Sequence, residues 1–488
     1  MTQFEQSAIS RIRETVAEAI AGHHLPGVSI GVVSGDNLVY AEGFGYADIE
    51  SREPMDPGRH QRIASITKTM TGLCTMALVD EGRLSLSGRV VDYLPEIAFD
   101  GPAARMTVHH LLTHTSGIGE APTADALAET VDPNHAGGEG GFSTMYADGI
   151  IVEAEPGTKR AYANHGYALL GEIIARAEDA PFADVLQRRV FEPLGMRDTT
   201  CTREVHTRAT TGYHRAPNDD TRELLERAGR PVPHEETVDG HNVRGKAVAN
   251  DHHGMLAAGA VQSTMPDMAR YAAALLRRGG GIVRPETFDA MVAPQWCPDD
   301  RLVSWGLSFS RWRRAGRRAF GHGGAYFGGW NSNLAVLPEE GLALIVHMNV
   351  MLDSPGPIFA RLQRAVLGAP APAIPDAPVD EDVLASAPGV YECTPGRLTN
   401  FRPSTNLGRV QITRDGTALT IRSRRGAWKQ GVLLVGSGEQ DPLLLAALAP
   451  DSDPATVLLT RDATGRIDGL SCDELVHMVR NESLQPWA

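Results

Sequence analysis

With 488 residues the chain is too long for one ordinary hydrophobic core, so two domains are expected. Its hydrophobic content of 42% and its charged content of 22% are typical of a soluble globular protein. The net charge is −14 without any basic cluster, which argues against nucleic acid and membrane surfaces as partners.

Several features of the sequence favour a cytoplasmic protein. The chain has no apolar run of 18 residues that would predict a membrane-spanning helix. Its N-terminus lacks the apolar core of a signal peptide and predicts an amphipathic helix that ends near Gly22. The cysteines show neither metal-ligand nor disulfide spacing: Cys74, Cys201, Cys297, Cys393 and Cys472. We therefore expect a reduced protein without metal or cofactor.

In chain order, two apolar runs at 27–33 and 38–43 flank a polar turn and predict a β-hairpin. A mostly helical and loop region follows through about residue 210. Three strand-like runs then lie between residues 319 and 348, and 358–367 predicts a closing helix. Strands at both ends of this region predict one sheet assembled from segments far apart in the chain.

Four prolines in residues 369–378 predict a stiff, extended linker. It would separate a first domain, residues 1–368, from a second, residues 379–488. Beyond the linker, short apolar runs alternate with turns such as Asp415-Gly416. This pattern is typical of a small antiparallel β-barrel or sandwich.

The most informative segment is Ser65-Ile66-Thr67-Lys68, because only four of the 46 basic residues are lysines. Arginine keeps its proton in proteins, whereas burial and neighbouring groups can make lysine a base. A helix is predicted over 67–81, and residues three apart share a helix face. The Lys68 amine would then lie beside the Ser65 hydroxyl, as an activated nucleophile requires. The alternative is a serine N-cap beside a solvated lysine.

Two further motifs accompany this segment. Tyr162-Ala163-Asn164 is the only Tyr-x-Asn in the chain, and His322-Gly323-Gly324-Ala325 lies in a predicted strand. With the segments 93–95, 111–118 and 193–196, these motifs resemble the serine β-lactamase and penicillin-binding superfamily. The resemblance is specifically to its class C β-lactamase, D-aminopeptidase and esterase branch, and it covers about residues 5–368. It implies an α+β, β-lactamase-like fold, in which an antiparallel sheet flanked by helices is joined to a mostly helical subdomain.

The resemblance also implies a role for each motif residue. Ser65 would be the nucleophile, Lys68 would activate it, and Tyr162 would relay the proton to the leaving group. Asn164 would bind a substrate carbonyl or amide, and the backbone N–H groups of Ser65 and Ala325 would form an oxyanion hole. Lysine and tyrosine ordinarily titrate near pH 10, so a base working near pH 7 needs a pKa shift of about 3 units. Burial and mutual proximity supply such shifts, and the pair then titrates jointly.

The third motif departs from the β-lactamase pattern. Most β-lactamases of this superfamily have lysine at its first position, where it recognises the carboxylate of the drug, and this chain has His322. Histidine is at most partly charged at neutral pH, which favours the peptidases, amidases and esterases of the family. Gly323 and Gly324 would let a substrate backbone lie close to the strand. Structural roles stay open for three residues: strand packing for His322, a turn for Asn164 and core packing for Tyr162.

The expected function is that of a serine hydrolase that forms an acyl-enzyme on Ser65. It would cleave an amide or peptide bond in a small-molecule or short-peptide substrate, including D-configured amino-acid amides. One alternative is a carboxylesterase or acyltransferase with weak β-lactamase activity, and another is a non-catalytic protein that binds penicillins or peptides. The second domain resembles the lipocalin-like barrels of some D-aminopeptidase-type members. It is a candidate for covering the active site or for mediating homo-oligomerisation.

Three other patterns in the chain are weaker indications of a functional site. The segment 27–31 matches the G-x-S-x-G elbow around Ser29, but it lies within a predicted strand and not at a strand-to-helix turn. The polar segment 214–253 and the glycine-rich stretch 137–141 are candidate lids. The acidic and histidine residues of the polar segment fit no standard zinc spacing: His234, Asp239, His241, Asp251, His252 and His253.

Overall fold

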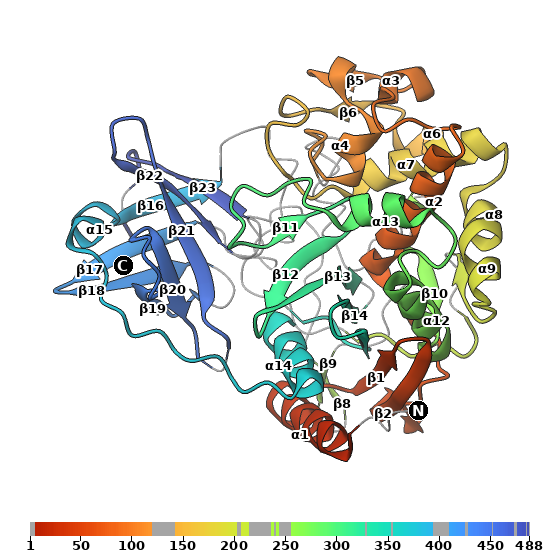
Figure 1. The fold of residues 1–488 in the computed structure, drawn as a ribbon, viewed down its shortest axis with the longest axis horizontal. Coiled ribbons are helices and arrows are strands. Elements are labelled where there is room, and N and C mark those ends of the chain that lie inside the picture. Colours follow the sequence, from red (N-terminus) through yellow and green to blue (C-terminus); the bar gives the residue numbers. More distant parts are fainter. Residues whose placement is uncertain are drawn as a thin grey trace.

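The computed structural model describes residues 5–119, 142–202, 206–213, 236–238, 241–243, 255–326, 329–352, 355–393, 409–424, 428–450, 452–472, 476–484 and 486–487. The candidate lid at 137–141 lies outside these residues. So does the polar segment 214–253, apart from two short strands, β8 (Glu236–Val238) and β9 (His241–Val243). Figure 1 shows a large body of helices and sheet beside a separate β-barrel.

Among the described residues, eight strands form the central sheet in the order β11-β12-β13-β14-β15-β1-β2-β3. Their bounds are β1 Gly27–Ser34, β2 Asn37–Asp48, β3 Glu53–Pro54, β11 Ser304–Trp305, β12 Ser310–Arg314, β13 Arg317–Tyr326, β14 Trp330–Leu337 and β15 Leu342–Met348. The strand β1 pairs antiparallel with both β2 and β15, so the two ends of this body meet in one sheet. The predicted hairpin and the predicted chain-distant sheet are both confirmed.

Helices cover both faces of this sheet. The helices α1 (Gln6–His23) and α14 (Gly356–Leu367) pack together, and their side chains join those of Val28, Ile30 and Val32 in one apolar cluster. The helix α12 (Met265–Leu276) covers the other face. A Cβ atom at Gly31 would lie 2.4 Å from the Met265 sulfur, so glycine lets α12 pack directly on β1.

A mostly helical subdomain stands on the α12 side of the sheet (Figure 1). Its helices are α2 Thr67–Asp80, α3 Val90–Tyr93, α4 Val108–Leu112, α6 Phe142–Met145, α7 Asn164–Glu178, α8 Phe182–Leu186, α9 Glu192–Leu194, α11 Leu256–Gly259 and α13 Pro285–Val292. Its short strands are β4 Gln61–Arg62, β5 Phe99–Asp100, β6 Ile150–Ile151, β7 Thr200–Cys201 and β10 Val261–Ser263.

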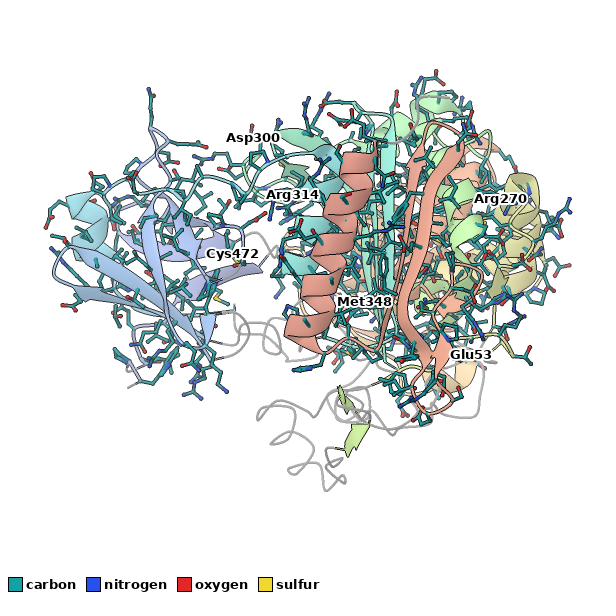
Figure 2. The ribbon with its side chains drawn as sticks, turned by 90° about the horizontal axis from the view of Figure 1, so that it is seen from below. Glu53, Arg270, Asp300, Arg314, Met348 and Cys472 are labelled. Carbon is teal, nitrogen blue, oxygen red and sulfur yellow. The ribbon has the colours of Figure 1, made fainter. Side chains whose placement is uncertain are left out.

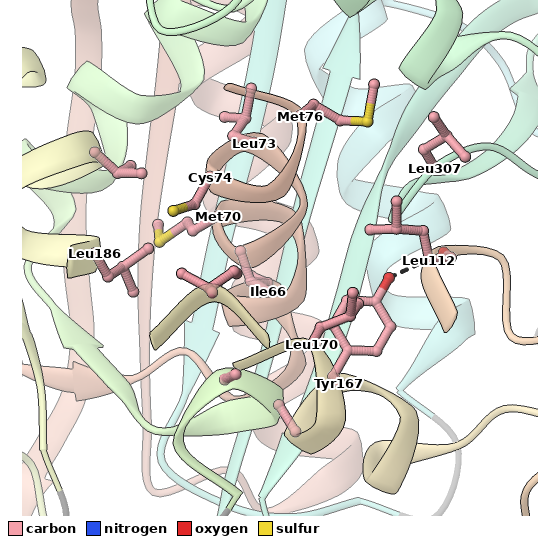
Figure 3. Packing of buried hydrophobic residues seen from close by; sticks show 14 of the residues in the cluster. Ile66, Met70, Leu73, Cys74, Met76, Leu112, Tyr167, Leu170, Leu186 and Leu307 are labelled. Carbon is pink, nitrogen blue, oxygen red and sulfur yellow. Dashed lines mark hydrogen bonds between the residues drawn. The ribbon is translucent and has the colours of Figure 1, made fainter. Parts of the chain in front are cut away.

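The helix α2 runs through the centre of this body, and Figure 3 shows it enclosed by side chains of the neighbouring helices. Every residue from 67 to 78 is buried, so α2 is enclosed on all sides along these turns. The buried threonines bond within the protein. Thr69 Oγ1 donates to the Ile66 carbonyl at 2.7 Å, and Thr71 Oγ1 donates to the Ala257 carbonyl at 2.8 Å. Because helices buried on all sides are strongly constrained, α2 provides a rigid base for the residues at its N-terminus.

The C-terminal part of the described chain forms a closed antiparallel barrel of eight strands, which decides between the predicted barrel and sandwich. The strands are β16 Gly389–Cys393, β17 Val410–Asp415, β18 Ala418–Ser423, β19 Val432–Gly436, β20 Leu444–Leu448, β21 Ala455–Arg461, β22 Ile467–Cys472 and β23 Val476–Arg480. A short helix, α15 (Glu381–Ser386), precedes them. Buried side chains such as Tyr391, Leu434 and Leu470 pack into one apolar cluster of this barrel. Among the described helices, none has the length and apolar character needed to cross a membrane.

The end of α7 is held by a carboxylate that three arginines share. Glu178 accepts hydrogen bonds from Arg83, Arg188 and Arg189, and only 4% of its side chain is exposed. The hydrogen bond from Arg189, the largest contribution, lowers the pKa of Glu178 from 4.5 to about 2, against the opposing effect of burial. Since the carboxylate is favoured in the folded state, its stabilising effect is complete above about pH 4.5 and is lost as the pH falls toward 2.

We expect Glu178→Gln to lower the free energy of unfolding by about 2 kcal/mol at pH 7. This difference from the wild type should shrink steadily as the pH is lowered from about 5 toward 3, because the wild type loses the same interaction by protonation. Urea unfolding at a series of pH values measures both effects. A difference that stays constant over this range would contradict the assigned role of the Glu178 charge.

Candidate active site

Ser65 lies in a 3₁₀ turn, Ala64–Ile66, that leads directly into α2. Its side chain is partly exposed, whereas the residues on either side are buried. Ala64 has a φ of +49°, a left-handed conformation that is unfavourable for a residue with a Cβ atom. The Ala64 side chain packs against Tyr326 and Trp330, and the amide N–H of Ile63 donates to the Val261 carbonyl at 3.1 Å. Contacts on both sides therefore hold the turn in its strained shape.

Lys68 is fully buried one turn further along, so the alternative of a solvated lysine is wrong. Its Nζ lies 3.0 Å from Ser65 Oγ and donates a hydrogen bond to the Ala258 carbonyl at 2.6 Å. The same nitrogen lies 5.0 Å from the centre of the Tyr162 ring and 5.5 Å from that of Tyr167. An uncharged amine has two N–H donors and one lone pair, so it can bond to Ala258 and still accept the hydroxyl proton of Ser65.

Two tyrosines thus face Lys68, and they have different surroundings. Tyr167 is fully buried, and its hydroxyl donates to the Leu112 carbonyl at 3.0 Å and contacts Ser308 Oγ at 2.8 Å. Burial raises the pKa of Tyr167, which keeps this phenol protonated. Tyr162 is only partly buried, in the segment just before α7. Tyr162 is therefore the better placed of the two for proton transfer to a substrate.

The side chain of His114 packs against the ring of Tyr162. The two rings are stacked, with centroids 4.2 Å apart and planes 26° apart. His114 Nδ1 accepts the amide N–H of Ala163 at 3.1 Å, so the histidine holds both the ring and the backbone of the Tyr162 segment. Its own φ is +57°. Asn164 follows as the first residue of α7, which places its backbone at the helix N-terminus beside Tyr162.

The strand β13 lies against the Ser65 turn. His322 and Gly324 are buried, whereas Gly323 and Ala325 alternate with them and are exposed. A Cβ atom at Gly324 would lie 2.4 Å from the Ile63 carbonyl oxygen and 2.1 Å from Ser332 Oγ. The Ser332 hydroxyl donates to that carbonyl at 2.7 Å. Glycine at 324 is thus required for the turn to approach the strand.

We expect Gly324→Ala to destabilise the protein by about 1–3 kcal/mol, because the new methyl group must displace the Ile63 carbonyl or Ser332. Gly323→Ala is the matched control, since a Cβ atom there meets nothing within 4 Å. Urea unfolding of both variants measures the difference. Equal stability of the two variants would contradict the close approach of β13 to the turn.

The His322 ring packs with those of Tyr162, Trp305 and His114. These four rings form an aromatic wall that the sequence did not predict. The His322 ring is T-shaped to Tyr162 at 6.1 Å between centroids and to Trp305 at 5.4 Å. Trp305 also contacts His114 at 5.1 Å, and the Arg160 guanidinium lies over its ring at 4.3 Å. No local pattern in the sequence connects Trp305, from β11, with Tyr162. Of these residues, only Arg160 could have been found from the sequence, because it lies two residues before Tyr162.

The structure thus brings Ser65, Lys68, Tyr162 and β13 into one site. The G-x-S-x-G segment is not part of it, because Ser29 is buried within β1, as predicted from the strand pattern. The described residues contain no cluster of three or more histidine, cysteine or acidic side chains that could hold a metal ion. Most residues of the histidine-containing segment near 234–253 lie outside the described part of the chain.

Comparison with known proteins gives matches along most of the chain. The sequence profile of the Beta-lactamase family matches residues 12–368. Protein flp of Staphylococcus aureus (strain MW2) is 31% identical over 179 residues, which are 36% of this chain and 35% of that protein. Penicillin-binding protein 4* of Bacillus subtilis (strain 168) is 28% identical over 199 residues, 41% of this chain and 42% of that protein. The chain therefore spans less than half the length of these two curated relatives.

Solved structures are similar over a larger share of this chain than the two curated relatives. The octameric penicillin-binding protein homologue from Pyrococcus abyssi has a TM-score of 0.61 at 22% identity, covering 97% of this chain and all of that one. The D-amino acid amidase from Ochrobactrum anthropi SV3, solved with L-phenylalanine amide, has a TM-score of 0.60 at 25% identity. That match covers 74% of this chain and 99% of the amidase.

Proposed function

Because this chain belongs to the β-lactamase and penicillin-binding protein superfamily, as its motifs predicted, we propose that it is an amide-cleaving serine hydrolase with Ser65 as nucleophile. Its substrate would be a short peptide or an amino-acid amide, with D-configured substrates included. The observation that carries this proposal is the fully buried Lys68 amine, 3.0 Å from Ser65 Oγ and next to the Tyr162 ring.

In the proposed acylation step, Ser65 Oγ attacks the substrate carbonyl while its proton passes to the joint Lys68–Tyr162 base. The carbonyl oxygen gains negative charge, which the backbone N–H groups of Ser65 and Ala325 would stabilise. The C–N bond then breaks, and Tyr162 gives the leaving amine a proton. Water then attacks the carbonyl carbon of the resulting ester while the Lys68–Tyr162 base takes a proton from it. The bond to Ser65 Oγ breaks, the carboxylic acid leaves, and the proton returns to the Ser65 oxygen.

Two observations favour an amide over an ester as the substrate. An amine leaves only when it is protonated, and Tyr162 occupies the more open position above Lys68, where it could supply that proton. The amidase from Ochrobactrum anthropi SV3 is also similar over 74% of this chain. A carboxylesterase or acyltransferase remains the second candidate, since the same acyl-enzyme forms from an ester.

A purely binding role fits the site less well. A receptor gains nothing from burying a lysine beside a serine, because burial of an amine without function costs stability. His322 is 4% exposed and its ring packs against aromatic rings, which differs from the lysine that recognises carboxylates in β-lactamases. We therefore propose weak turnover of β-lactams at most.

The proposal is tested by incubating the protein with a fluorophosphonate probe, followed by intact-mass measurement and peptide mapping. A single adduct on Ser65 is expected. The second arm compares p-nitrophenyl esters with p-nitroanilides that carry the same D- or L-aminoacyl group. Turnover of esters but of no anilide would reject the amidase in favour of the esterase, and failure to label Ser65 would favour the binding protein.

A further inference from the structure

Residues 296–305 form a loop that follows α13 and ends in β11, and its two ends are bonded to each other. The amide N–H of Trp296 donates to the Trp305 carbonyl, and that of Trp305 donates to the Trp296 carbonyl, both at 2.9 Å. Trp305 belongs to the aromatic wall of the candidate active site, where its ring contacts those of His114, Tyr162 and His322. The base of the 296–305 loop is therefore part of the site.

The tip of the same loop is bonded to the C-terminal barrel. Arg301 Nη1 donates to Asp441 at 2.8 Å, and Asp441 lies between strands β19 and β20 of the barrel. The same guanidinium holds Asp299 within the loop, at 2.8 Å through Nε and 2.7 Å through Nη2. Arg301 thus joins the loop to itself and to the barrel with one rigid group. In Figure 2, Asp300 at the loop tip lies on the side that faces the barrel.

Further ion pairs join the body and the barrel near Arg301. Arg314 donates to Asp453 at 2.6 Å, and Arg364 bonds to the same carboxylate. A cavity of about 310 Å³ lies among these arginines, the prolines of the linker and the barrel residues around Glu439 and Asp453. Ion pairs of Arg301, Arg314 and Arg364 thus join the body to the barrel around this cavity.

From these contacts we propose that the barrel positions Trp305 in the active-site wall through the Arg301–Asp441 ion pair. The barrel would act on the 296–305 loop from its tip, and the loop would transmit this restraint to Trp305 at its base. Trp305 is then a positioning residue for Tyr162 and His322. The catalytic consequence rests on the proposed function, whereas the restraint on the loop does not.

The test variant is Asp441→Asn in the chain of 488 residues. Asp441 Oδ1 also accepts the amide N–H of Leu443 at 2.9 Å, and asparagine keeps this acceptor while removing the charge that holds Arg301. We expect hydrogen exchange of the 296–305 amides to become about tenfold faster. We also expect kcat/KM on the best substrate of the anilide and ester panel to fall about threefold to tenfold, and Asp441→Glu to restore it.

The control is Asp453→Asn, which removes the charge held by Arg314 and Arg364 at the same junction but does not touch the loop. Exchange of the 296–305 amides and kcat/KM should stay at wild-type values in this variant. The proposal is overturned if loop exchange is unchanged in Asp441→Asn, or if both variants have the same effect. It is also overturned if loop exchange rises while kcat/KM stays constant.

If the proposed function is wrong, these experiments give a different result. In that case the wild-type protein would turn over no substrate and Ser65 would not react with the fluorophosphonate. The hydrogen-exchange comparison of Asp441→Asn with Asp453→Asn would still decide whether the barrel restrains the loop.

Discussion

Replacing Ser65 with alanine is expected to lower kcat/KM by about 10⁴-fold or more and to abolish fluorophosphonate labelling, because the attacking oxygen is lost. The fold should be unchanged. Ser65 is partly exposed, and Lys68 keeps its hydrogen bond to the Ala258 carbonyl when the hydroxyl is removed. We therefore expect the free energy of unfolding to change by less than about 1 kcal/mol. Intact-mass measurement and urea unfolding give the two quantities.

The control for this variant is Ser29→Ala, at the serine of the elbow-like segment. Ser29 is 2% exposed within β1 and lies outside the site, so this variant should be labelled at the wild-type rate. Labelling of Ser65→Ala at another serine would show that the nucleophile lies elsewhere. Loss of labelling in Ser29→Ala, with an intact fold, would have the same meaning.

The sequence predicted those parts of the fold that depend on local periodicity. The helix after Ser65 was expected over 67–81 and is found at Thr67–Asp80, and the first hairpin lies where its polar turn placed it. In the barrel, the strands β16, β20 and β23 have no clear strand pattern in the sequence. The alanine-containing run of β20 and the polar residues of β16 and β23 lack the apolar alternation that marks their neighbours.

The aromatic wall of the site shows why the remaining features could not be predicted. Trp305 contacts Tyr162 only because β11 joins β12 and β13 at one end of a sheet whose other strands come from the first residues of the chain. Such long-range pairing leaves no trace in local sequence. The pair Gly323 and Gly324 shows the same limit. The motif predicted one role for both glycines, whereas the structure requires a glycine for close packing only at 324.

The role of Lys68 leads to the second large effect. We expect Lys68→Arg to lower kcat/KM by about 10²–10⁴-fold although it keeps the positive charge, because a guanidinium does not release its proton and cannot act as a base. Lys68→Met should lose activity to a similar extent, since it fills a similar volume without an amine. If Lys68 acted only through its charge, the arginine variant would keep its rate and the methionine variant would not.

Stability must be measured alongside activity, because Lys68 is fully buried and a larger guanidinium overfills its pocket. Lys68→Met tests the chemistry without this overpacking, so equal activity losses in two variants of unequal stability would assign the effect to the missing base. The exposed Lys429 of the barrel provides the control, and Lys429→Arg should leave both rate and stability unchanged. A near-native rate of Lys68→Arg would refute proton transfer through Lys68. In that case the neighbouring Tyr162 would have to accept the Ser65 proton alone, and Lys68 would serve only to stabilise the tyrosinate.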